Sequence, residues 1–95
     1  MNKDEQVTTG KGFKVRIFDL DKGLIEYENI KAVRMISQDY NLLIMEDYLP
    51  IIGEIEGSVK LELVKDSVVL KNIKGYFMNK KNQFNLFIKE EEENE

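Results

Sequence analysis

The stretch FKVRIF, residues 13–18, alternates apolar and charged side chains along its first five positions. Its apolar residues Phe13, Val15 and Ile17 are separated by single basic residues. Successive side chains of a β-strand point to opposite faces of the sheet. A period of two therefore predicts a strand here, with one buried face and one solvated face.

The same alternation recurs in SVKLELV at 58–64 and in QFNLFIK at 83–89. Residues 24–37 look like one long strand or two strands joined by a bulge, and a shorter apolar run follows at 41–45. Two further strands are expected from composition, over residues 67–73 and 75–79.

Short polar segments separate these strands and predict turns at residues 19–23, 37–41, 65–66 and 79–83. Strands then recur about every ten residues without a long helical pattern, which predicts an all-β fold. We expect an antiparallel β-sandwich of about eight to ten short strands, or a barrel. A helix over residues 30–45 remains an alternative, although β-branched residues are common there and the helical stripe is incomplete.

The 95 residues are enough for one domain, which we place at 13–89. A polar, flexible arm is expected over 1–12 and an acidic, disordered tail over 90–95. The N-terminus lacks the apolar region of a secretory signal, and no apolar run reaches the length of a membrane helix. We therefore expect a cytoplasmic protein.

Composition argues against most catalytic chemistry. The chain has no Cys and no His, which removes thiol chemistry, imidazole catalysis and the usual zinc ligands. Its net charge of −4 argues against a nucleic-acid partner. The carboxylate pairs Asp19/Asp21 and Glu46/Asp47 fit turns better than a calcium loop or an acid–base pair. We expect no enzyme activity, no metal and no cofactor.

Pro50, the only proline, lies inside an apolar run. Proline cannot donate a hydrogen bond to a sheet, so it predicts a corner where the chain enters a strand from an edge. On this interpretation Glu46 and Asp47 stay in solvent while the following isoleucines, Ile51, Ile52 and Ile55, contribute to the core.

The order of these features is similar to a known family. FKVRIF is followed by KGLIEYENIKAVRM, then by YNLLIMEDYLPII at 40–52, a turn at Glu56–Gly57, and IKGYFMNKKNQFNLFIKE at 73–90. Residues 13–90 thereby resemble the N-terminal β-sandwich of the epsilon subunit of F-type ATP synthases. Pro50 falls within the family's G-x-x-G-I-L-P-G-H-A-P-L-L stretch, Tyr48 replaces its histidine, and Gly75 matches the second glycine of a later pair.

The resemblance implies a non-catalytic rotor subunit of the central stalk, bound to a gamma-like shaft within an alpha- and beta-like ATPase assembly. In complete synthases this sandwich also rests on a membrane c-ring, at the inner face of the membrane. By position, the shaft contacts would be Asp19, Tyr48, Pro50 and Ile52, and the ring-facing loop would be Ser37, Gln38, Asp39, Tyr40 and Asn41. The plain alternatives are that Ile52 belongs to the core and that 37–41 is only a solvated loop.

Further expectations follow from the same resemblance. The family's C-terminal helical pair is absent from the sequence, so we expect neither ATP binding nor inhibition by inserted helices. Abundant Lys, Ile and Asn suggest an A/T-rich genome, such as that of a mollicute with a specialised, even gliding-associated, ATPase. The competing hypothesis is an unrelated small β-sandwich that acts as an adaptor or binds a ligand through its tyrosines, Tyr27, Tyr40, Tyr48 and Tyr76.

Overall fold

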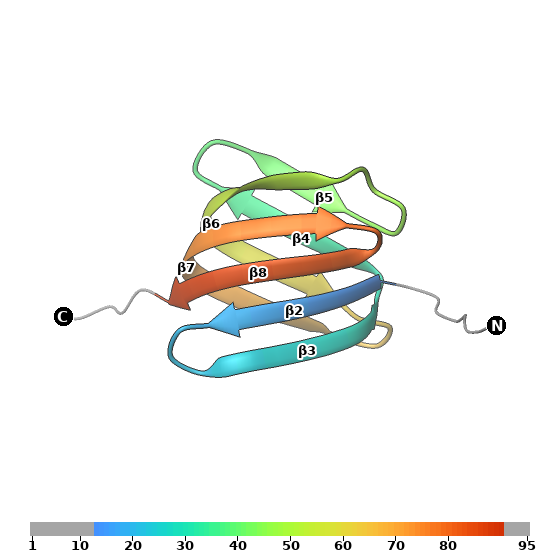
Figure 1. Cartoon of the computed structure of the whole chain (residues 1–95), viewed down its shortest axis with the longest axis horizontal. Coiled ribbons are helices and arrows are strands. Elements are labelled where there is room, and N and C mark those ends of the chain that lie inside the picture. Colours follow the sequence, from blue (N-terminus) through green and yellow to red (C-terminus); the bar gives the residue numbers. More distant parts are fainter. Residues whose placement is uncertain (1–12, 91–95) are drawn as a thin grey trace.

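The computed structural model of the chain describes residues 13–90, and every regular element within this range is a strand. The expected arm at 1–12 and residues 91–95 of the expected tail lie outside the described residues, whereas Glu90 ends the last strand. The strands are β2 (Phe13–Asp19), β3 (Gly23–Ile30), β4 (Ala32–Ser37), β5 (Asn41–Ile44), β6 (Ile51–Glu62), β7 (Ser67–Lys80) and β8 (Gln83–Glu90) (Figure 1).

The seven strands form one sheet in the order β3-β2-β8-β7-β6-β4-β5. The prediction of an all-β, sandwich-like fold is confirmed, and the helix over 30–45 is wrong because β4 and β5 occupy that segment. All neighbouring pairs are antiparallel except β2 and β8, which run parallel. Fewer strands than expected are described, because the two predicted over 67–73 and 75–79 are one continuous strand, β7.

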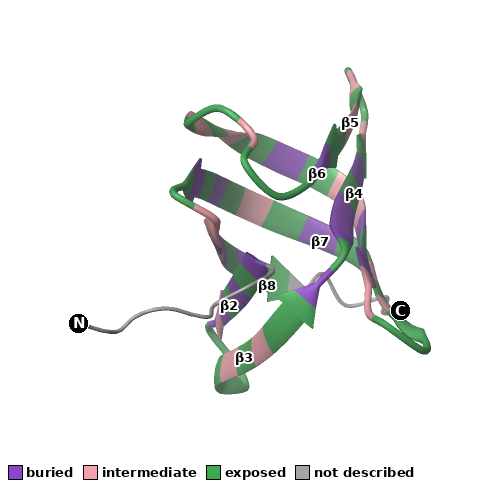
Figure 2. Ribbon diagram, turned by 90° about the vertical axis from the view of Figure 1, so that its right-hand side faces the viewer, coloured by how far each residue is buried: buried purple, intermediate pink, exposed green. Residues whose placement is uncertain are grey.

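The sheet curls back on itself. β3 lies at one edge and β4 lies next to the other edge, yet only Lys31 separates them in sequence. The Lys31 amide donates to the Glu62 carbonyl at 2.7 Å, which ties this connection to the end of β6. Segment 24–37 is therefore two strands, as one of the alternatives predicted, but they are joined by a crossing at Lys31 rather than by a bulge. They belong to opposite parts of the folded sheet (Figure 2).

A β-bulge in the long β6–β7 hairpin produces the fold-over. Ser58 faces two residues of β7, Lys71 and Asn72, because the register shifts between Gly57 and Val59. Asn72 has a positive φ of 55°, and such bulges bend a strand and increase its twist. The turn expected at Glu56–Gly57 is therefore wrong, since both residues lie inside β6 at this bend.

The core fills the space between the two halves of the folded sheet. Alternation places one side chain in two inside, as predicted, and the Phe77 and Phe84 rings stack there with centroids 5.8 Å apart. Gly53 makes room for the Phe77 ring, because a methyl group at this position would touch it. The buried cluster consists of Phe13, Val15, Ile17, Ile30, Val33, Met35, Ile44, Ile55, Val59, Leu61, Ile73, Phe77, Phe84, Leu86 and Ile88.

The Pro50 corner lies where the sequence predicted it, immediately before β6. The β7–β8 turn holds the loop ahead of it: the Asp47 amide donates to Asn82 Oδ1 at 2.6 Å, and Asn82 Nδ2 donates to Asp47 Oδ1 at 3.2 Å. Lys81 and Asn82 both have positive φ, as a two-residue hairpin turn of type I′ requires. The Asn82 carbonyl also accepts the Lys14 amide at 3.0 Å, so one turn residue joins three segments.

Replacement of Gly57 by alanine should destabilise the protein at the bend. The added methyl group would overlap the Ile36 carbonyl oxygen of β4, so we expect a loss of about 1–3 kcal/mol in the free energy of unfolding. Urea denaturation measures this loss, with Ser58→Ala on the adjacent residue as the control. A Gly57→Ala protein as stable as the control would contradict the account of the bend.

Two substitutions at Asn82 separate its hydrogen bonds from its backbone conformation. Asn82→Gly keeps the positive φ and loses the two side-chain bonds to Asp47, which should cost about 1–2 kcal/mol. Asn82→Ala should cost roughly 1 kcal/mol more, because alanine disfavours the left-handed region. Thermal unfolding of both variants tests this order, and equal losses would show that the backbone conformation carries no cost.

Candidate interaction surface

The outer side of β3, β2, β8 and β7 carries a row of apolar side chains where the alternation would place polar ones. Phe18 pairs across the sheet with Leu24 on one side and with Phe87 on the other, and Phe87 pairs with Tyr76. Met78 and Ile52 pair with each other two residues further along the same side. We call this surface the apolar face and define it as Leu24, Phe18, Phe87, Tyr76, Met78 and Ile52.

Most of the apolar face is open to solvent. Ile52 is 73% exposed and Tyr76 is 60% exposed, and both lie in the β6–β7 half of this side of the sheet. The Phe18 and Phe87 rings stack with centroids 4.8 Å apart and planes 9° apart, which fixes their orientation without covering them. Stacked rings of this kind form a pre-ordered contact surface, since little side-chain freedom remains to be lost on binding.

A shallow groove of about 490 Å³ runs along one end of the apolar face. Its lining includes Leu20, Leu24 and Tyr76 together with the stacked pair Phe18 and Phe87. Contiguous exposed apolar patches mark interaction sites in soluble domains, and aromatic residues are enriched at the centres of protein interfaces. The arrangement therefore suits a protein partner.

A second groove, of about 440 Å³, adjoins the first at Tyr76. We call it the tyrosine groove, because Tyr40 and Tyr76 both line it. The loop that follows β4 forms one wall, and β6 and β7 form the other. Its lining residues are 37–40, 54–56 and 74–76.

Hydrogen bonds fix the loop wall of the tyrosine groove. The Glu56 amide donates to Ser37 Oγ at 2.9 Å, and the Ser37 hydroxyl donates to the Glu56 carbonyl at 3.3 Å. The Gln38 amide also donates to that carbonyl, at 3.2 Å, and the Tyr40 hydroxyl donates to the Glu54 carbonyl. The loop is therefore anchored to the edge of β6 rather than free in solvent.

The pKa of Tyr40 is raised above the ordinary value of a tyrosine. Burial of its hydroxyl is the main cause, the negative charge of Glu54 adds to it, and a hydrogen bond with Ser37 opposes it. The hydroxyl consequently stays protonated well into the alkaline range and remains a hydrogen-bond donor.

The structure divides the predicted ring-facing loop in two. Ser37 and Tyr40 are half-buried against β6, and Tyr40 also packs on the core. The outward positions are Gln38, Asp39 and Asn41, all of them exposed.

The predicted shaft contacts do not form a single cluster. Tyr48 is half-buried and packs on the core, while Pro50 and Ile52 are exposed at the start of β6. The exposure of Ile52 excludes the core interpretation for this residue.

Asp19 lies apart from that corner. Through successive strand pairs its row of the sheet leads to Ile55 of β6, three residues beyond Ile52. It is 5% exposed, and its Oδ1 accepts the amides of Asp21 at 2.8 Å and Lys22 at 3.1 Å. Asp19 thus holds the β2–β3 turn, as the turn interpretation of the aspartate pair predicted.

Sequence reasoning missed Leu24, Phe18, Phe87 and Met78 as surface residues. A signal was present for Phe18, Phe87 and Met78, because each is apolar and lies between two residues that the alternation turns inward. Phe87, for example, lies between the buried residues Leu86 and Ile88. An apolar residue at a solvated position of a well-formed alternation is the pattern to search for.

Other kinds of site find no support in the part of the chain that the structure describes. Among residues 13–90, no three side chains of the metal-ligating types lie close enough together to hold a metal ion. No helix in this range is long and apolar enough to cross a membrane. The chain matches no protein-family model and no curated protein.

Stability at alkaline pH should report the environment of Tyr40. Above pH about 10 the unfolded chain has lost the Tyr40 proton while the folded chain keeps it. The free energy of unfolding should therefore fall as the pH rises through this range, and this contribution should be constant below it. Tyr40→Phe should remove that part of the slope in chemical denaturation. If the free energy of unfolding falls with pH equally in Tyr40→Phe and in wild type, the raised pKa of Tyr40 is contradicted.

Proposed function

We propose that this chain is a non-catalytic rotor subunit of an F-type ATPase or of a specialised relative, and that it binds a gamma-like shaft. The observation that carries the proposal is the apolar face, which continues to Ile52, a residue the sequence resemblance assigns to shaft contact. The all-β, sandwich-like fold and the order of sequence features along residues 13–90 support the same proposal.

The physical requirements of a rotor contact agree with this surface. A subunit that transmits or bears force without chemistry needs a rigid framework and an extended contact area rather than a deep pocket. The apolar face spans strands from β3 to β6. The opposite side of the same strands packs on the core, which makes the framework behind this face rigid. A stable protein–protein contact usually buries about 800 Å² on each partner, with aromatic residues near its centre.

Where the assembly includes a c-ring, the outward residues Gln38, Asp39 and Asn41 are the proposed contacts with it. They lie on a loop that is held to β6 by hydrogen bonds, so a polar contact there would cost little ordering entropy. On this proposal the protein acts at the inner face of the cell membrane through its partners. A specialised mollicute ATPase, including one used in gliding, is the proposed setting, based on the abundance of Lys, Ile and Asn and on the departures from the family stretch.

Co-expression with the gamma-, alpha- and beta-like subunits of the same genome tests the proposal. We expect the chain to elute with the ATPase assembly on gel filtration. Ile52→Asp should weaken binding to the gamma-like subunit by about 1–3 kcal/mol, or roughly 5- to 150-fold in Kd, because it buries a charge in the contact. Val69→Asp is the matched control, as Val69 is an exposed apolar residue of β7 that pairs with Lys60, on the other side of the bulge from Ile52.

A stable monomer that never associates with these subunits would overturn the proposal. Saturable binding of a peptide or glycan through the tyrosines, without any ATPase partner, would favour the adaptor hypothesis instead. Tyr48→Ala should weaken the association and also lower the free energy of unfolding, since Tyr48 packs on the core. Ile52→Asp should affect the association alone. Unfolding of each variant is measured alongside binding to separate the two effects.

A further inference from the structure

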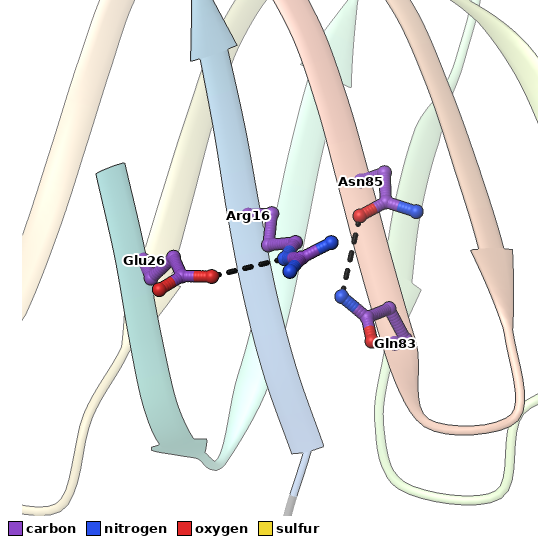
Figure 3. Close-up of polar contacts among 4 residues, drawn as sticks. All are labelled: Arg16, Glu26, Gln83 and Asn85. Carbon is purple, nitrogen blue, oxygen red and sulfur yellow. Dashed lines mark hydrogen bonds and ion pairs between the residues drawn. The ribbon is translucent and has the colours of Figure 1, made fainter. Parts of the chain in front are cut away.

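The two sides of the apolar face differ in charge. On the β2–β3 side, Arg16 Nε donates to Glu26 Oε2 at 3.0 Å, and the adjacent amides of Gln83 and Asn85 bond to each other at 3.3 Å (Figure 3). Arg16 and Glu26 neutralise each other's charge, and the two amides satisfy each other's hydrogen bonding. That side of the face therefore presents little unbalanced charge to a partner.

The β6 side, at the tyrosine groove, is acidic. Its lining includes three carboxylates, Asp39, Glu54 and Glu56, and one ammonium group, Lys74, which gives a formal charge of −2 from three minus one. Lys74 lies opposite Glu56 in the pairing of β6 with β7, so one cation stands among the three carboxylates. Within residues 13–90 none of these three carboxylates forms an ion pair, in contrast to Glu26 on the other side.

We propose that the apolar face and the tyrosine groove form one docking surface for a partner segment of defined chemistry. The segment places apolar side chains against the row that runs from Leu24 on β3 to Tyr76 on β7. It carries a lysine or arginine at the end that enters the tyrosine groove. The identification of this partner as the gamma-like shaft rests on the proposed function. The charge pattern predicted for the segment rests on the surface alone.

Tyr76 connects the two parts of this surface, because it lines both grooves together with its strand neighbours Lys74 and Gly75. A cation placed between Tyr40 and Tyr76 would contact aromatic ring surface and the carboxylates of the same groove. Cation–π contacts favour arginine, whose planar group also stacks on rings and binds carboxylates through two hydrogen bonds. The anchored loop keeps Tyr40 in place for this contact.

The charge of the groove also narrows the class of partner. Phosphate groups of nucleic acids and anionic lipid headgroups would be repelled by the surplus carboxylates. A second copy of this chain would bring its own acidic groove to the contact, and the protein already carries a net charge of −4. A protein segment with a basic end is the occupant that complements both the apolar row and the acidic groove.

Charge-neutralising variants test the predicted basic end. In binding assays with the purified gamma-like subunit, Glu54→Gln combined with Glu56→Gln should raise Kd about tenfold at low salt and flatten its dependence on salt. Glu28→Gln combined with Asp66→Asn is the matched control: it also removes two charges, from exposed positions away from the groove, and should leave Kd unchanged. Equal Kd values and salt slopes for the double variant and wild type would overturn the proposal while leaving the shaft function intact.

A photo-crosslinking residue in place of Met78 identifies what covers the apolar face in the cell. Mass spectrometry of the crosslinked product should show a partner peptide that carries apolar residues and a nearby lysine or arginine. The same reagent in place of Val69 should not give this product. If the peptide comes from a protein other than a shaft subunit, the docking chemistry stands and the rotor function fails. A peptide without a basic residue, or one from a second copy of this chain, overturns the docking chemistry.

Discussion

The β-bulge between Gly57 and Val59 is the constraint on which this structure depends. A single seven-stranded sheet cannot bury one of its faces unless it folds over, and the bulge bends the β6–β7 hairpin where the fold-over occurs. Gly57 makes the bend compatible with β4, because its missing side chain leaves space for the Ile36 carbonyl. The remaining features then follow: both halves of the hairpin contribute to the core, and Lys31 is enough to carry the chain from one edge toward the other.

The fold-over also creates the surface from which we infer function. Because the first half of β6 continues the sheet of β2, β8 and β7, its Ile52 pairs with Met78, two residues along the same side from the row that contains Phe87 and Tyr76. The same bend leaves the edge of β6 free for the loop after β4, whose hydrogen bonds with Glu56 and Glu54 build the tyrosine groove. An apolar contact area and an acidic groove thus lie side by side on one rigid framework. In the proposed docking, the apolar face binds the apolar side chains of the partner segment and the tyrosine groove binds its basic end.

Local patterns predicted the strands well and the surface poorly. The alternation in FKVRIF and QFNLFIK assigns inward residues correctly, because a strand's period of two does not depend on its neighbours. The turn at Glu56–Gly57 was mispredicted because glycine is common both in turns and in bulges, and only the pairing of β6 with β7 distinguishes them. Asp19 and Ile52 were grouped by a linear resemblance, yet the register separates them, since residues near one another in a motif can occupy different rows of a sheet.

The sequence by itself determined the fold class, the inward face of most strands, the corner at Pro50 and the absence of cysteine and histidine chemistry. These are properties of single segments, fixed by periodicity, composition and the missing N–H of proline. Only the tertiary structure decided that Phe18, Phe87 and Tyr76 form one row and that Ser37 and Tyr40 close a groove on β6. Such neighbours come from strands far apart in the chain, and their register is set by how the whole sheet packs its core.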